Sequence, residues 1–294
     1  MSSWKIVPVR KLQIDHRTEY RFGSPVTLLP HYLLLRPRES HGLRIASSTL
    51  TISAPHHIRW QRDAFDNSVA QVSFSAPASS LSLVSDILIE HYDEEPLDFV
   101  VEAHAAFHPF RYSQEDANVL APLCALAWPN DRFAVANWLR ALALGGARIE
   151  TFVLLDQLNR AISRDFRYEA REAPGVQSPA MTLSRRSGSC RDFAALFLEA
   201  CRQLGLASRF VSGYHTSPPH EIGPGSTHAW AEVYLPGPGW KGFDPTAGVV
   251  TGSEHIAVAV ARHPELVPPV AGSYLGAGVR PSMQVWVRVH TVAP

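Results

Sequence analysis

The spacing of apolar residues changes near residue 98, and this change restricts the chain to a fold with two different parts. Before it, short segments that partly alternate apolar with polar residues are separated by proline or Asp-Asn turns. Leu81, Leu83, Ile87 and Ile89 keep the two-residue period of a half-buried strand. Short strands at such regular spacing are typical of a β-sandwich, which we predict for residues 1–98. The predicted strands are Leu12–Phe22, His31–Arg36, Leu43–Ser53, His57–Asp63, Ser68–Phe74 and Leu81–Tyr92.

After Asp98 the apolar residues recur every three to four positions, as on one face of a helix. This spacing predicts helices over residues 133–144 and 149–162, the first of which ends before two glycines. Alternation returns at Met283–Val289, which we predict to be a strand. The fold class is therefore α+β, with an N-terminal all-β sandwich domain (1–98) and a mixed domain (99–294). A length of 294 residues agrees with two domains of about 150 residues each.

The composition argues against binding to nucleic acid or to an anionic membrane, because 27 Lys and Arg balance 27 Asp and Glu. No apolar run approaches the roughly 18 residues of a membrane helix. Lys5, Arg10 and Lys11 interrupt the N-terminal segment, so it lacks the apolar stretch of a signal peptide. Three cysteines are too few, and odd in number, for a disulfide framework. We therefore expect a cytoplasmic protein with no membrane or nucleic-acid partner.

The segment Ser187-Gly188-Ser189-Cys190-Arg191-Asp192-Phe193 predicts a helix that begins at a cysteine. Ser189, followed three residues later by Asp192, is a helix-capping signal, and apolar residues then recur at helical spacing up to Gly205. Cys190 is thus the first helical residue. There the free backbone N–H groups and the helix dipole favour a thiolate and could hold an oxyanion. We predict Cys190 as a catalytic nucleophile.

A histidine and an aspartate further along the chain could complete a catalytic triad with Cys190. A strand pattern begins at His228, and after a Pro-Gly-Pro-Gly turn a short strand ends at Asp244. If the turn were only these four residues, Asp244 would pair with Ala231 and face away from His228. We therefore predict an odd loop length or a bulge that pairs Asp244 with Trp230. His228 would then act as the base, and Asp244 would orient it.

The other cysteines and the nearby arginines have simpler interpretations. Cys201 lies on the apolar face of the predicted helix, and Cys124 has no charged partner nearby in sequence, so both are interpreted as structural. Three arginines, Arg185, Arg186 and Arg191, surround the nucleophile. They are either ordinary charges at a helix start or they stabilise the thiolate or attract an acidic substrate.

Histidines elsewhere raise the question of a metal site. Glu102, His104 and His108 are close in sequence, but a proline follows directly and no fourth ligand is visible, so we predict no zinc there. His215 and His220 flank a Ser-Pro-Pro loop and are expected to border the cleft and shape the substrate site. No dinucleotide, phosphate-binding or metalloprotease motif is present. Acyl transfer by a thiol needs no cofactor, and we expect none.

The blocks that carry these residues resemble the bacterial transglutaminase-like family. The resemblance covers residues 188–194, 228–237 and 239–246, the family's N-terminal β domain at 16–22 and 34–38, and its C-terminal signature at 254–260. It implies a papain-like core over about residues 150–250, in which a helix with the catalytic cysteine at its N-terminus packs on an antiparallel sheet. It also implies Cys190 as nucleophile, His228 as base and Asp244 as the orienting residue. Because no EF-hand-type acidic loop is present, calcium activation is not expected.

Together these observations favour a thiol-dependent acyl-transfer enzyme that acts on peptide or carboxamide bonds. Family members are often regarded as cysteine proteases, so we expect hydrolysis of a peptide or protein substrate. Two alternatives remain: transfer of the acyl group to an amine, as in a transglutaminase, and a non-catalytic binding protein that retains the fold. Redox sensing at Cys190 is less favoured than either alternative, because it would need neither His228 nor Asp244.

Overall fold

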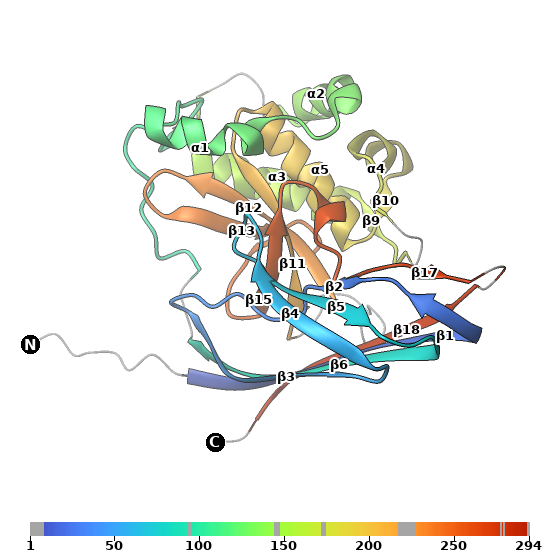
Figure 1. Ribbon diagram of the computed structural model, residues 1–294. Helices are drawn as coiled ribbons and strands as arrows, with labels where there is room; N and C mark the ends of the chain where they lie inside the picture. The colour runs from blue at the N-terminus through green and yellow to red at the C-terminus, as the bar shows by residue number, and fades with distance from the viewer. Residues whose placement is uncertain are drawn as a thin grey trace, which may run out of the picture.

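Two antiparallel β-sheets pack face to face in the N-terminal part of the molecule (Figure 1). The structure, a computed structural model, describes residues 9–92, 96–143, 148–171, 175–216, 227–276, 278 and 280–292. The first sheet contains β1 (Val9–Leu28), β6 (Ala78–Tyr92) and β3 (Leu43–Ile52), and the second contains β2 (His31–Leu33), β5 (Ser68–Phe74) and β4 (His56–Arg62). Phe22, Leu33, Val72 and Leu83 are buried between them. The prediction of an N-terminal β-rich region is confirmed.

Three short C-terminal segments return to complete both sheets. β18 (Ser282–Thr291) pairs with β1, β17 (Tyr274–Leu275) pairs with the end of β1, and β16 (Val270–Ala271) pairs with β2. The predicted C-terminal strand is therefore part of the N-terminal sheet. β1 itself continues to Leu28, beyond the end predicted from its glycine and proline, after a register shift between Arg21 and Val26.

The rest of the chain is a five-stranded antiparallel sheet covered by helices. Its order is β14 (Val249–Val250), β13 (Gly239–Asp244), β12 (His228–Leu235), β11 (Ser208–His215) and β15 (His255–Ala261). Helix α5 (Cys190–Gln203) lies against β11 and β12, and its residues 192–202 are all buried. Helices α1 (Gln114–Cys124), α2 (Arg132–Ala141), α3 (Thr151–Asp165) and α4 (Pro179–Arg185) surround α5, as Figure 1 shows. The smaller elements are β7 (Phe107–His108), β8 (Ile149–Glu150), β9 (Arg167–Tyr168), β10 (Ser187–Gly188), η1 (Pro129–Asp131) and η2 (Pro264–Leu266). No helix in the described ranges is long and apolar enough to cross a membrane.

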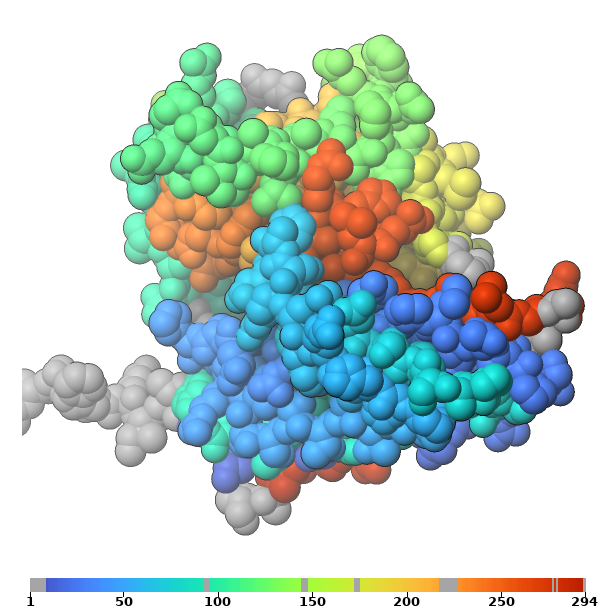
Figure 2. Space-filling view, in the orientation of Figure 1, coloured from blue at the N-terminus to red at the C-terminus, as the bar shows by residue number. Residues whose placement is uncertain are grey.

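The N-terminal sheets are fastened to the free edge of β15. The Arg38 backbone N–H donates to the Ala257 carbonyl oxygen at 2.8 Å. The Asn67 amide donates to the Val260 carbonyl oxygen (2.8 Å) and accepts from the Val260 N–H (2.9 Å), so it replaces a neighbouring strand. In Figure 2 the blue N-terminal strands lie directly against the orange and red segments that follow residue 250. The edge of the core sheet is therefore covered.

A glycine on β11 leaves room for a buried tryptophan of the core. A Cβ atom on Gly213 would lie 2.3 Å from the Ile256 carbonyl oxygen and 2.5 Å from the Trp230 ring. We expect Gly213→Ala to lower the free energy of unfolding by about 2–3 kcal/mol, because neither the β15 backbone nor the buried Trp230 ring can give way without repacking. Urea denaturation measures this change. Gly252→Ala is the control, because its Cβ would meet nothing closer than Pro96 at 3.4 Å. Equal stability of the two variants would contradict the prediction.

Candidate active site

Helix α5 begins at Cys190, as the capping signal predicts. Ser189 is the N-cap residue, and its backbone N–H and its hydroxyl both donate to the Asp192 carboxylate at 2.8 Å. The two residues before the cap pair in parallel with β9, where Gly188 lies opposite Tyr168. Cys190 is half-buried, at the helix end where unpaired N–H groups collect. This arrangement fixes the thiol on a rigid support.

Asp192 is the anchor of this helix start. The residue is fully buried, and its two oxygens accept hydrogen bonds from Arg171, Gln177 and Ser189. Burial raises the pKa of Asp192, but these hydrogen bonds outweigh it and the pKa lies below the ordinary value. The roles of Arg171 and Gln177 were not predicted, because nothing in their local sequence indicates a contact with residue 192.

The strands β12 and β13 bring Asp244 to His228. Ala231 lies opposite Phe243 and Leu235 opposite Gly239, so the loop has three residues and Asp244 falls opposite Trp230. The predicted odd loop length is confirmed. His228 Nε2 donates to Asp244 Oδ2 at 2.8 Å, and both side chains are almost completely buried.

The second ring nitrogen of His228 is left for the thiol. His228 Nδ1 is buried, and no atom of the described residues forms a hydrogen bond with it. Burial lowers the pKa of His228, but the interactions with Asp244 and Cys190 outweigh burial and raise the pKa above its ordinary value, to about 10. Cys190 is therefore close enough to His228 for their charges to interact. The structure brings together the three residues that the sequence predicts.

The side-chain carboxylate of Asp244 accepts four hydrogen bonds from the described residues. Its Oδ1 accepts from the backbone N–H groups of Thr246 (2.9 Å) and Ala247 (3.4 Å). Its Oδ2 accepts from His228 and also from His255 Nε2, at 3.2 Å. Burial raises the pKa of Asp244, but the hydrogen bonds from the two histidines hold it well below its ordinary range. The carboxylate therefore stays ionised beside His228.

A pocket of about 470 Å³ opens at Cys190 and His228. Its charged lining residues are Arg171, Arg191 and Glu265. Tyr168 also lines it; burial, and then the charge of Cys190, raise the pKa of this phenol, so it stays neutral. The apolar lining residues include Val176, Phe210, Val267, Pro268 and Pro269. The pocket is large enough for a peptide side chain next to the thiol.

The other residues singled out in the sequence take different places. Arg191 lines the pocket, whereas Arg186 reaches the Asp165 carbonyl oxygen and Arg185 is exposed at the end of α4. Cys201 is fully buried, which raises its pKa, and burial also raises the pKa of Cys124. Both cysteines are therefore poor nucleophiles near neutral pH.

The histidines near residue 105 do not converge. His104 pairs with Glu102 at 3.3 Å, whereas His108 donates to the Leu204 carbonyl oxygen at 2.9 Å. His215 lies beside the triad, with its ring centroid 5.4 Å from that of His228. His220 lies outside the described residues.

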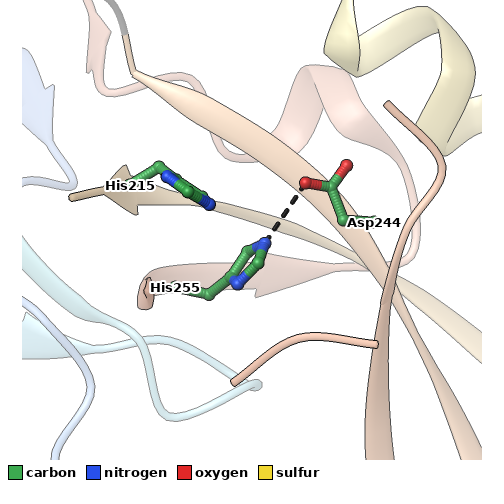
Figure 3. Close-up of side chains that lie close together, drawn as sticks. All are labelled: His215, Asp244 and His255. Carbon is green, nitrogen blue, oxygen red and sulfur yellow. Dashed lines mark hydrogen bonds and ion pairs between the residues drawn. The ribbon is translucent and has the colours of Figure 1, made fainter. Parts of the chain in front are cut away.

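One group of side chains has the composition of a metal site. His215, Asp244 and His255 each offer a ligand atom, and these atoms lie within 4.8 Å of one another (Figure 3). The Gly252 N–H donates to His255 Nδ1 at 3.4 Å, so the ring proton is on Nε2, where it is donated to Asp244. A metal ion on Nε2 would displace this proton. The neutral ring would then carry its proton on Nδ1, where it would face the Gly252 N–H. The donors therefore fit a hydrogen-bonded cluster better than a metal ion.

Comparisons with known proteins identify the family of both parts of the chain. Residues 12–90 match the bacterial transglutaminase-like N-terminal region, and residues 150–245 match the transglutaminase-like superfamily. The uncharacterized protein Rv2569c of Mycobacterium tuberculosis is 31% identical over 277 residues, which cover 89% of this chain and 87% of the relative. The uncharacterized protein ML0607 of Mycobacterium leprae is 25% identical over 290 residues, covering 91% and 94%.

A solved structure shares the whole fold. A candidate cysteine protease from Cytophaga hutchinsonii superposes with a TM-score of 0.72 at 18% sequence identity. The match covers 98% of this chain and 92% of that protein, so it includes the β-rich N-terminal part as well as the core.

Proposed function

Because the chain belongs to the transglutaminase-like superfamily and has a cysteine-protease-like fold, we propose that it is a thiol-dependent enzyme that hydrolyses peptide or carboxamide bonds. Cys190 is the nucleophile, His228 the acid and base, and Asp244 orients His228. The observation that carries the proposal is the hydrogen bonding of the two ring nitrogens of His228. Its Nε2 is held by Asp244, and its buried Nδ1 is left for the half-buried thiol at a helix N-terminus.

The proposed reaction has two halves. In the first, the Cys190 thiolate bonds to the carbonyl carbon, and the oxyanion that forms is stabilised by the Cys190 backbone N–H. The carbon–nitrogen bond breaks as His228 Nδ1–H gives its proton to the leaving amine, and a thioester remains. In the second, water attacks the thioester while His228 takes one of its protons. The carbon–sulfur bond then breaks, and the thiolate and the imidazolium are restored.

The test is the rate at which iodoacetamide alkylates Cys190, measured from pH 5 to pH 9. The background variant is Cys124→Ser, so that alkylation reports Cys190 alone. We expect a nearly constant rate between pH 6 and pH 8, because His228 stays protonated over this range and pairs with the thiolate. In His228→Ala the rate should fall about tenfold for each pH unit below 8, as for an ordinary free cysteine.

Two further measurements complete this test. Cys190→Ala, made in the Cys124→Ser variant, is the negative control and should incorporate no label. A screen of fluorogenic peptide amides, with and without an added primary amine, separates hydrolysis from acyl transfer, because only transfer consumes the amine. A rate profile that is the same in the wild type and in His228→Ala would refute the proposed pair and would favour a binding protein.

A further inference from the structure

We propose that His255 is a positioning residue that fixes the Asp244 carboxylate and connects the N-terminal sheets to the reacting groups. This inference rests on the proposed function. His255 is not among the residues that line the pocket. It acts on Asp244, which in turn holds His228.

The hydrogen bonds around His255 determine which way its ring faces. The Gly252 N–H donates to Nδ1 at 3.4 Å, so this nitrogen carries a lone pair and Nε2 carries the proton. That proton is directed at Asp244 Oδ2, 3.2 Å away, as the dashed line in Figure 3 shows. A carboxylate oxygen has two lone pairs, and Oδ2 gives one to each histidine. The carboxylate is thus held from two directions in addition to the backbone donors on its other oxygen.

Packing prevents the His255 ring from turning away. Its side chain is 5% exposed. The Trp230 ring stands edge-on to it, with centroids 5.2 Å apart, and the His215 ring does the same at 4.5 Å. His215 is also its cross-strand partner on β11. The imidazole therefore has one available orientation, which is the one that meets Asp244.

The N-terminal part of the chain holds the backbone that carries this ring. Glu254, the preceding residue, accepts a hydrogen bond from Thr216 and pairs with Arg10 at 3.5 Å. Arg10 also donates to the Ser253 carbonyl oxygen at 2.6 Å. Together with Arg38 and Asn67 further along β15, these contacts fix the strand on which His255 stands. A structural role is therefore assigned to the β-rich part: it sets the position of a residue that orients the triad.

The experiment compares His255→Leu with His255→Gln. Leucine removes the donor, whereas the glutamine amide nitrogen is the same number of bonds from Cα as Nε2 and can still donate to Asp244. With a peptide amide that the wild type hydrolyses, we expect kcat to fall about 10- to 100-fold in His255→Leu, with KM within twofold, because a displaced base is costly. His255→Gln should restore kcat to within about threefold of the wild type. Circular dichroism and the melting temperature of both variants exclude a general loss of fold.

Two kinetic outcomes would overturn this inference. One is wild-type kcat in His255→Leu, and the other is an equal loss of kcat in both variants at equal stability, which would indicate packing alone. A second measurement does not depend on activity: nitrogen-15 NMR of the histidine rings in Cys190→Ala. It should show His255 protonated at Nε2, and protonation at Nδ1 instead would refute the bond to Asp244. If wild-type Cys190 alkylates as an ordinary thiol, the proposed function fails, yet the ring proton still decides whether His255 holds Asp244.

Discussion

Asp244→Asn should lower the turnover of any peptide amide by about ten-thousandfold, the loss found when a triad aspartate is replaced by asparagine. The reason is the number of donors around the side chain. Oδ1 accepts from the N–H groups of Thr246 and Ala247, and Oδ2 accepts from His228 and His255. An asparagine has one acceptor oxygen, so in either orientation its NH₂ group faces two donors. If that group faces His228, the ring must turn or take the other tautomer. Nδ1 is then no longer in place to pair with the Cys190 thiolate and to transfer the proton.

The control for this prediction is an aspartate with an ordinary surface contact. Asp156 pairs with Arg160 one turn along α3, at 2.8 Å, and Asp156→Asn should leave turnover within twofold of the wild type. Iodoacetamide alkylation distinguishes a damaged triad from a damaged substrate site, because the reagent needs no substrate contacts. Turnover by Asp244→Asn at even a tenth of the wild-type rate would show that Asp244 does not orient the base.

The parts of the site that the sequence predicted are those set by local geometry. Ser189 and Asp192 are three residues apart, and a capping box has a fixed spacing, so the helix start and the position of Cys190 could be predicted. The register between His228 and Asp244 followed from the two-residue period of a strand, because only an odd loop places both on one face.

The parts that the sequence did not predict depend on contacts between distant segments. Arg171 reaches Asp192 across 21 positions, and neither residue carries a local signal of the other. His255 lies in a segment that resembles a family signature, but only the order of strands β11 and β15 places it beside Asp244. The pairing of β18 with β1 joins the two ends of the chain. An alternating pattern identifies a strand but does not identify its partner, so this closure of the N-terminal sheet required the structure.

Asp192→Asn should reduce the free energy of unfolding by about 3–5 kcal/mol, the range for a buried ion pair that loses one partner. Arg171 donates to both oxygens (2.9 and 3.1 Å), the Gln177 backbone N–H to Oδ1 (2.7 Å), and Ser189 to Oδ2. An amide again offers one acceptor oxygen to donors that approach from both sides. Because these bonds hold the first turn of α5, the alkylation of Cys190 at pH 6 should also slow.

The pH dependence gives this prediction a definite sign. The pKa of Asp192 is lowered in the folded protein, so its contribution is present at pH values above the ordinary carboxyl pKa of about 4 and is lost as the pH falls through the folded value. The stability difference between the wild type and Asp192→Asn should therefore be largest near pH 7 and shrink below about pH 4.

Asp116 is a matched control, because it also lies three residues after a serine cap, on α1. It is only half-buried, so Asp116→Asn should cost less than about 1 kcal/mol at any of these pH values. Urea midpoints that are the same for the two variants at pH 7 would mean that Asp192 is an ordinary helix cap and not the anchor of the nucleophile.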